Sequence, residues 1–159
     1  MTNMKKIIII SDSHGNRKAL DELDNIFAEC DCIIHLGETS SDGGYIRKQY
    51  PDKTVVINGN CDVFGLGENE KVISFEGVNI FACHGHLYSV KSTLTRLVKR
   101  AKELDCTLAL YGHTHDAKES EIDGLTLINP GTLSRYSQKS YMYLVINGDA
   151  FTHKIVWIN

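Results

Sequence analysis

The sequence has neither an excess of basic residues nor a long apolar run, and each absence argues against a class of protein. Its 17 lysine and arginine residues are balanced by 20 aspartate and glutamate residues, and the net charge is −3. A protein dedicated to polyanions usually carries a strong basic excess, so we expect no nucleic-acid partner. No apolar stretch approaches the ~20 residues that span a bilayer, so we expect no membrane association.

Cysteine is present, but without the pattern of a disulfide framework. The count of five is odd, and no paired spacing recurs. Cys30 and Cys32 have no second pair with which to complete a thiolate metal site. Reduced thiols that pack as small core residues explain the cysteines better, which favours a cytoplasmic protein. The opening run Ile7–Ile10 lacks the length and the cleavage site of a signal peptide, so we interpret it as a core strand.

The sequence also lacks internal repeats, low-complexity segments and obvious linkers. The 159 residues therefore predict one domain, 1–159. A domain of this size buries roughly 70% of the surface of its unfolded chain, which is enough for a hydrophobic core without disulfides.

Five apolar runs organise the first 115 residues, and most are continuous rather than alternating. They are Ile7–Ile10, Cys32–Leu36, Val55–Ile57, Ile80–Cys83 and Leu108–Tyr111. Continuous runs are typical of strands covered on both faces, and we interpret His35 as a strand residue whose imidazole is hydrogen-bonded. Helical spacing between the runs predicts helices over 20–27, 45–49 and 90–104, with Asn16 capping the first.

Three short turn signals predict hairpins in the second half of the chain. They are Glu76-Gly77, Asp123-Gly124 and Asn147-Gly148. The first part of the chain thus alternates strands and helices, and the last third is expected to be an antiparallel meander. This order predicts an α/β domain in which helices cover mixed sheets.

Each of the five apolar runs is followed by side chains that can bind a metal ion. They are Asp12 and His14, Glu38, Asn60, His84, and His113 with His115. One such residue alone is more often a cap or a solvated loop residue. Five in succession are harder to explain that way, because ligand crevices of α/β sheets form at the carboxyl ends of strands. Neighbouring glycines permit the sharp turns that would aim these side chains into one site.

The candidate ligands combine carboxylate, amide and imidazole groups. This mixture suits Mn²⁺, Zn²⁺, Fe or Ni²⁺ rather than a thiolate site or a calcium cage. Seven candidates are too many for one ion with an open position, but they suit two ions that share a carboxylate. Two ions would clamp the oxygens of a displacement at phosphorus and would turn a bridging water into hydroxide at neutral pH. The residue types therefore predict a phosphoester hydrolase.

These residues lie in motifs that resemble those of the calcineurin-like metallophosphoesterases. The motifs are, in order, Asp12-Ser-His14, Gly37-Glu38, Gly59-Asn60-Cys61-Asp62, His84-Gly85-His86 and Gly112-His113-Thr114-His115. The segment Asn129-Pro130-Gly131-Thr132 is also similar to one in the small YfcE-like phosphodiesterases. The resemblance implies a four-layer α-β-β-α sandwich of two mixed sheets. It also implies hydrolysis of a small phosphodiester with two divalent ions, Mn²⁺ foremost and Zn²⁺, Ni²⁺ or Fe as alternatives.

The resemblance further implies roles for single residues. The first ion would be held by Asp12, His14, Glu38 and His115. The second ion would be held by Glu38, Asn60, His84 and His113. The expected catalytic group is Asn60, Cys61, Asp62 and His86. His86 would either contact the substrate or orient a metal ligand.

Two positions depart from the family pattern. Cys61 stands where the wider superfamily often has a histidine, and a thiol is a poorer general acid near neutral pH. This favours diesters over alkyl monoesters, unless Cys61 is merely a small residue that fits. Glu38 stands where the family has aspartate, and its extra methylene leaves three outcomes open. Glu38 bridges two ions with a shifted loop, binds one ion and weakens the other, or belongs to a degenerate site. We expect Glu38 to bind metal while one ion is held weakly.

Two further functions are compatible with the sequence. One is a catalytically weak protein-interaction scaffold on the same fold, like the retromer scaffold subunit. Retention of the other ligand positions favours the enzyme. The other is a nuclease, against which the lack of a strong basic groove argues.

Phe64 could stack on an aryl group of the substrate or pack in an ordinary loop. The sequence fixes neither the natural diester nor whether the chain forms a homo-oligomer.

Overall fold

The computed structural model describes residues 4–62, 65 and 67–159, and its strands form two five-stranded sheets. The first sheet has the strand order β10-β9-β1-β2-β3. Its strands are β1 (Met4–Ile10), β2 (Cys32–His35), β3 (Thr54–Val56), β9 (Lys139–Asn147) and β10 (Ala150–Ile158). Strands β1, β2 and β3 are parallel to one another, and the hairpin of β9 and β10 adds to β1 in the antiparallel direction.

The second sheet has the strand order β4-β5-β6-β8-β7. Its strands are β4 (Glu70–Phe75), β5 (Val78–Cys83), β6 (Leu108–Leu110), β7 (Lys118–Ile122) and β8 (Leu125–Asn129). The three central strands are parallel, and antiparallel strands form both edges. Both sheets are therefore mixed, as the sequence predicts.

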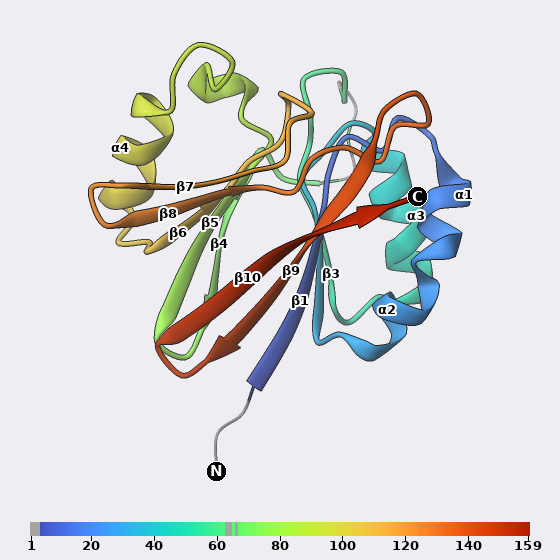
Figure 1. Cartoon of the computed structure of the whole chain (residues 1–159), viewed down its shortest axis with the longest axis horizontal. Coiled ribbons are helices and arrows are strands. Elements are labelled where there is room, and N and C mark those ends of the chain that lie inside the picture. The colour runs from blue at the N-terminus through green and yellow to red at the C-terminus, as the bar shows by residue number, and fades with distance from the viewer. Residues whose placement is uncertain (1–3, 63–64, 66) are drawn as a thin grey trace.

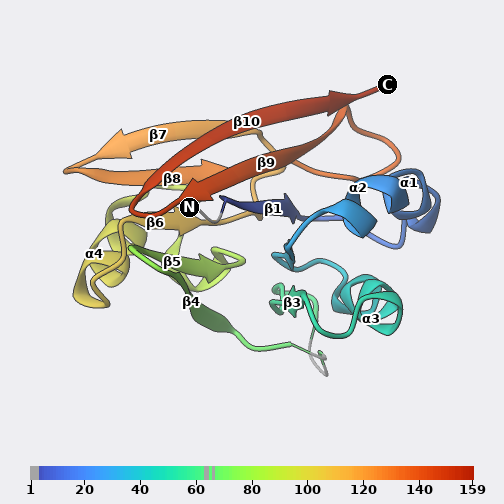
Figure 2. The same ribbon diagram turned by 90° about the horizontal axis from the view of Figure 1, so that it is seen from below.

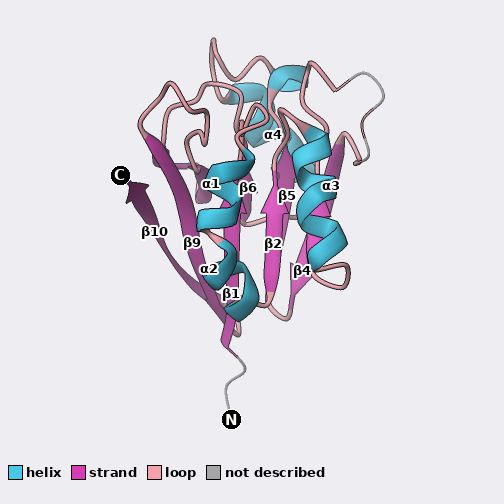
Figure 3. Ribbon diagram, turned by 90° about the vertical axis from the view of Figure 1, so that its right-hand side faces the viewer, coloured by secondary structure: helices cyan, strands magenta, loops and turns pink. Residues whose placement is uncertain are grey.

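The two sheets pack face to face, and helices cover their outer faces (Figures 1 and 2). The helices are α1 (Arg17–Glu22), α2 (Asp24–Glu29), α3 (Ser40–Gln49) and α4 (Thr95–Glu103), together with a 3₁₀ turn at His86–Tyr88. Figure 3 shows α1, α2 and α3 in front of the first sheet. Helix α4 buries Leu97, Val98 and Ala101 against the second sheet. The four layers α-β-β-α confirm the expected fold.

The fourfold isoleucine run of β1 shows why the apolar runs are continuous. All four side chains of Ile7–Ile10 are fully buried. Ile7 and Ile9 pack in the core between the sheets, whereas Ile8 and Ile10 pack beneath the helices. A strand in the middle of such a sandwich has no solvent face, so neither set of alternate positions can be polar.

The structure differs from the sequence-based expectation in four places. The helix expected over 20–27 is divided into α1 and α2, which meet at Leu23. The helix expected over 90–104 begins only at Thr95, although Val90 still packs in the same cluster as α4. The helix expected over 45–49 is longer and begins at Ser40. In the last third, β8 pairs with β6 in the parallel direction, so this part is not a purely antiparallel meander. Strand propensity alone does not reveal pairing direction, which the long-range packing decides.

The arrangement of the parallel strands decides where a functional site can form. Strands β1, β2 and β3 run in the same direction, and so do β5, β6 and β8. The loops that follow them gather at the end of the sandwich opposite to the N-terminus (Figure 3). Crevices for ligands form at this end of such sheets.

Candidate metal centre

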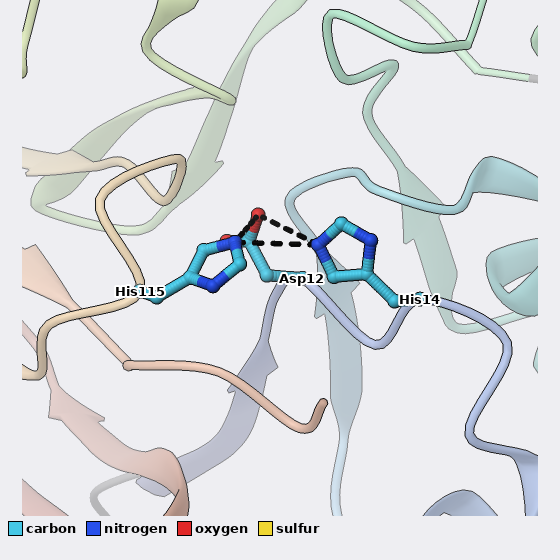
Figure 4. A group of neighbouring side chains, drawn as sticks. All are labelled: Asp12, His14 and His115. Atoms are coloured by element: carbon cyan, nitrogen blue, oxygen red, sulfur yellow. Dashed lines mark hydrogen bonds and ion pairs between the residues drawn. The ribbon is translucent and has the colours of Figure 1, made fainter. Parts of the chain in front are cut away.

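Three candidate ligands from two distant loops meet at the carboxyl end of β1. Asp12 and His14 follow β1, and His115 follows β6. The Nε2 atoms of His14 and His115 lie 3.2 Å apart. Asp12 Oδ1 lies 3.2 Å from His115 Nε2 and 3.9 Å from His14 Nε2 (Figure 4). One ligand atom from each residue falls within 4.8 Å of the others, which is close enough for all three to hold one ion.

The Asp12 carboxylate is placed for a cation. Its Oδ2 atom accepts hydrogen bonds from Ser11 Oγ at 2.6 Å and from the His113 backbone N–H at 3.0 Å. Its Oδ1 atom is buried and accepts no well-oriented hydrogen bond. A buried oxygen without a donor is costly, and a bound cation would remove that cost. Burial raises the pKa of Asp12, but the imidazoles of His115 and His84 outweigh it, so the pKa is lowered and the group is ionised.

His84 presents a bare nitrogen to the same space. Its side chain is fully buried, and its Nδ1 atom lies 2.8 Å from the carbonyl oxygen of Leu36. Because a carbonyl can only accept, Nδ1 carries the proton and Nε2 carries a lone pair. That Nε2 atom is buried without a hydrogen-bond partner, 3.8 Å from Asp12 Oδ1 and 4.0 Å from Glu38 Oε1. This is the arrangement by which an outer hydrogen bond orients a ligating histidine.

Glu38 lies at the centre but turns its carboxylate toward the third loop. Its Oε1 atom accepts a hydrogen bond from the Cys61 backbone N–H at 2.5 Å. The carboxylate packs directly on Gly59, where a Cβ atom would lie 2.4 Å from Oε1. Only glycine leaves room for the longer side chain here. In this conformation Glu38 does not belong to the cluster of Asp12, His14 and His115.

Asp62 acts on the backbone around Glu38. Its Oδ2 atom accepts hydrogen bonds from the Gly59 N–H at 2.6 Å and from the Glu38 N–H at 3.2 Å. These bonds fix the loop after β2 against the loop after β3. Asp62 thus holds the backbone of Glu38 in place, and its expected catalytic role stays a prediction.

The remaining candidates surround this centre. The ring centroids of His84 and His113 are 5.0 Å apart, and those of His84 and His86 are 5.5 Å apart. His86 Nδ1 is buried without a hydrogen-bond partner, and burial lowers the pKa of both His86 and His113. Asn60 is exposed, and its Nδ2 atom lies 3.6 Å from Cys61 Sγ.

Cys61 is exposed at the rim of the centre. A hydrogen bond with the Glu38 carboxylate and the charge of that carboxylate raise the pKa of the thiol. Cys61 is therefore protonated at neutral pH, and its side chain can donate but not attack as a thiolate. Phe64, the other residue with an expected substrate contact, lies outside the described residues.

The backbone of the centre adopts an uncommon conformation. Five of the candidate ligands have a positive φ angle, between 46° and 71°, namely Asp12, His14, Glu38, His113 and His115. Residues other than glycine adopt this region rarely, and such residues cluster at functional sites. The sharp turns after the strands thus come from the ligands themselves as well as from their glycine neighbours.

A buried network that we did not predict joins two of the ligand loops. Ser13, between Asp12 and His14, donates a hydrogen bond to Asp42 Oδ2 at 2.6 Å and lies 2.8 Å from His35 Nε2. His35 Nδ1 accepts from the Gly37 N–H at 3.0 Å, so Nε2 carries the proton and donates to Ser13. All three side chains are almost fully buried. The expected hydrogen bond of His35 is thereby confirmed, but its partners are not apparent from sequence spacing.

The end of β8 and the segment that follows it are a second support for the centre. Asn129 Nδ2 donates to the Gly112 carbonyl at 3.2 Å and to Thr114 Oγ1 at 2.9 Å, which holds the loop of His113 and His115. Thr132 Oγ1 donates to the Asp12 carbonyl at 2.8 Å. The segment Asn129-Pro130-Gly131-Thr132 therefore supports the loops that carry the candidate ligands.

Comparison with known proteins decides the family. The calcineurin-like phosphoesterase superfamily domain matches residues 4–149. The chain belongs to this superfamily. The probable metallophosphoesterase YsnB of Bacillus subtilis (strain 168) is 34% identical over 152 residues, which are 92% of this chain and 87% of YsnB. The phosphodiesterase YfcE of Escherichia coli (strain K12) is 23% identical over 155 residues, which cover 82% of this chain and 80% of YfcE.

Solved structures agree on the fold of this calcineurin-like domain. A conserved Streptococcus pneumoniae TIGR4 protein, described as a predicted phosphoesterase, superimposes with a TM-score of 0.82 at 24% identity, covering 99% of this chain and 91% of that one. Vacuolar protein sorting 29 from Cryptosporidium parvum has a TM-score of 0.76 at 17% identity, covering 98% of both chains. The superfamily implies divalent metal ions, and the donor set around Asp12 and His84 fits them.

Proposed function

We propose that this calcineurin-like protein is a metal-dependent phosphodiesterase with a dinuclear centre. One observation carries the proposal. Asp12 Oδ1 and His84 Nε2 are buried acceptors 3.8 Å apart, and neither has a hydrogen-bond partner. Folding leaves His84 Nε2 without a donor and gives Asp12 Oδ1 only the His115 imidazole at 3.2 Å, so a cation between them would satisfy both atoms. The name of YfcE, a phosphodiesterase, supports the reaction class.

Seven residues would hold the two ions. Asp12, His14, Glu38 and His115 would hold the first, and Glu38, Asn60, His84 and His113 would hold the second. The ions, with Mn²⁺ as the first candidate, would supply Lewis-acid chemistry at the phosphate and at the attacking water. The protein fixes the Asp12 carboxylate through Ser11 and fixes the lone pair of His84 through Leu36.

Glu38 and Asn60 must adjust before the second ion can be held. To bridge two ions, Glu38 would weaken the hydrogen bond that its Oε1 atom accepts from the Cys61 N–H, and Asn60, a ligand through Oδ1, would adjust the contact of its Nδ2 atom with Cys61 Sγ. Breaking these contacts opposes metal binding. We therefore propose that the first ion is held tightly and the second weakly.

The leaving group determines which phosphoesters are turned over. Cys61 is protonated but is a weaker acid than a histidine, because Glu38 raises the pKa of its thiol. Diesters with good leaving groups need little protonation, whereas alkyl monoesters need more. We propose that small phosphodiesters are preferred.

Four of the five free cysteines are buried. Because reduced thiols are typical of the cytoplasm, we propose that the protein is cytoplasmic. No helix among the described residues is long and apolar enough to cross a membrane.

The decisive assay uses metal-free protein and bis(p-nitrophenyl) phosphate. Hydrolysis should be absent with EDTA, should appear with Mn²⁺, and should exceed the hydrolysis of p-nitrophenyl phosphate. Failure of Mn²⁺, Zn²⁺, Ni²⁺ and Fe²⁺ to support any turnover would contradict the proposal.

A scaffold is the second candidate function, because vacuolar protein sorting 29 shares the fold. The assembled cluster of Asp12, His14 and His115 favours the enzyme, since an interaction surface alone has no need of a buried carboxylate grouped with two imidazoles. The same assay separates the two functions.

A further inference from the structure

Two cavities meet beside the candidate metal centre. The first has a volume of about 460 Å³ and is lined by His14, Gly15, His115, Ser134, Arg135 and Tyr136. Because it contains two candidate ligands of the first ion, it is the space in which the scissile phosphate would lie. Arg135 also lines the second cavity, so the two spaces adjoin.

The second cavity is basic and lies outside the metal centre. Its volume is about 500 Å³, and its lining includes Lys18, Arg135 and Lys139 against one acidic side chain, that of Glu22, and Asn159, the last residue of the sequence, with its α-carboxylate. Among the ion pairs of the described residues, none involves any of these four side chains. The whole chain carries a net charge of −3, so this is a local excess of unpaired cations. A concave surface with such an excess concentrates anions.

The loop that separates the cavities has a fixed base and an exposed tip. Leu133 is fully buried, its N–H donates to the Ser11 carbonyl at 3.2 Å, and its carbonyl accepts from Asn16 Nδ2 at 2.8 Å. The loop runs beside α1 in both views (Figures 1 and 2). Two residues later the tip carries Arg135 and Tyr136, and Tyr136 is 93% exposed. The base of the loop therefore has a fixed place relative to Asp12, and its tip extends from this base.

We propose that the second cavity is a subsite for a further phosphate of the substrate. The preferred substrate would then be a small phosphodiester whose esterified group carries a second phosphate. Arginine and lysine form short charge-assisted hydrogen bonds with phosphate oxygens. Tyr136, which follows the shared Arg135 and lines the first cavity, adds an aromatic face that suits a nucleoside between the two phosphates. This subsite rests on the phosphodiesterase function proposed above.

A pair of dinucleotides tests the subsite. The probes are TpT and its 5′-phosphorylated form pTpT, measured as competitive inhibitors of bis(p-nitrophenyl) phosphate hydrolysis by the Mn²⁺-loaded protein. Competition reports binding whether or not the dinucleotides are cleaved. We expect the inhibition constant of pTpT to be lower by ~10-fold or more, because its terminal phosphate adds charge-assisted hydrogen bonds.

The double substitution Lys18→Gln and Lys139→Gln should reduce this ratio to about twofold or less, since it removes two of the phosphate-binding cations. The matched control is Lys48→Gln with Lys154→Gln, which makes the same change in net charge at exposed positions away from both cavities. The control should keep the wild-type ratio. If the double variant fails to fold by circular dichroism, Lys18→Gln alone, on the exposed face of α1, should lower the ratio in the same direction.

The outcomes separate the subsite from the function beneath it. No metal-dependent hydrolysis of bis(p-nitrophenyl) phosphate would defeat the phosphodiesterase function. Hydrolysis with equal inhibition constants for TpT and pTpT would defeat the subsite alone. A preference for pTpT that survives loss of Lys18 and Lys139 would also overturn it, because the terminal phosphate would then bind at the metal centre.

Discussion

The two halves of the candidate metal centre differ in how completely the chain assembles them. In the half of Asp12, His14 and His115, the ligand atoms already lie within 4.8 Å of one another. In the other half, Glu38 accepts a hydrogen bond from the Cys61 N–H, and the Nδ2 atom of Asn60 contacts Cys61 Sγ. The first half consists of short side chains on turns held by buried hydrogen bonds. The second depends on a longer carboxylate that has another partner. Preorganisation, rather than the number of ligands, therefore distinguishes the two halves.

The largest effect is expected when the assembled half is broken at Asp12. Asp12→Asn keeps the size of the side chain but removes the charge that an ion would neutralise. Loss of even an outer-shell partner typically costs 10–100-fold in metal affinity, so for this direct ligand we expect a loss of at least ~100-fold. Titration calorimetry with Mn²⁺ measures it.

Asp149→Asn is the matched control, because Asp149 lies in the exposed turn between β9 and β10. It should leave Mn²⁺ affinity unchanged. Wild-type affinity in Asp12→Asn would show that the cluster around Asp12 is not a metal site.

Shortening Glu38 should make the two halves more alike. In Glu38→Asp the shorter carboxylate can no longer reach the Cys61 N–H as it does now. The side chain then has the length of the aspartate in the family pattern. A misplacement of about 1 Å can cost ~100-fold, so the weaker site should tighten by up to that factor. Mn²⁺ binding and hydrolysis of bis(p-nitrophenyl) phosphate should both increase.

Glu38→Gln controls for the charge, since it keeps the length and should weaken both sites. If Glu38→Asp binds the second ion no better than the wild type, the extra methylene is not what limits that half.

Breaking the buried network of Ser13, His35 and Asp42 should weaken the support of the half formed by Asp12, His14 and His115. Ser13→Ala leaves His35 and Asp42 without their shared partner. An unsatisfied buried polar group costs ~1–3 kcal/mol, so the melting temperature of the metal-free protein should fall. Metal affinity should fall by ~10-fold as well, because Ser13 lies between two ligands.

Ser92→Ala is the control, because Ser92 is exposed and lies outside the buried network of Ser13, His35 and Asp42. A Ser13→Ala protein with unchanged metal affinity would assign the network to stability alone.

The smallest effect is expected at the rim. Cys61→His supplies an imidazole near the leaving group, and general acid catalysis of this kind grows with a pKa near the working pH. Hydrolysis of p-nitrophenyl phosphate should rise by about a few-fold relative to the diester. A Cys61→Ser variant should not show the change. A wild-type protein that already favours monoesters would contradict the role given to Cys61.

The strands and the ligand loops could be predicted from sequence because their signals are local. The continuous run Ile7–Ile10 required burial on both faces, and Asp12 and His14 follow it directly. The partners of Ser13 could not be predicted, because Asp42 is 29 residues away and contact depends on how α3 packs. The basic cavity could not be predicted either, because it also depends on contacts between residues that are distant in the sequence. Lys18 and Lys139 line it together only because the chain brings α1 beside the start of β9.

The direction in which Glu38 points was also beyond sequence analysis. Its identity showed that the carboxylate is longer than the family pattern, but not that Gly59 and the Cys61 N–H would receive it. The Glu38 carboxylate can contact either the ions or the Cys61 N–H. Which contact forms depends on small differences in the distance between the loops.

Titration of Mn²⁺ into the metal-free wild-type protein, followed by calorimetry, tests the difference between the two halves most directly. Two binding events should be resolved, a tight one and a second that is weaker by ~10-fold or more, because the second half must first release Glu38. Two sites of equal, tight affinity would contradict this account and would show that Glu38 moves to the ions without measurable cost.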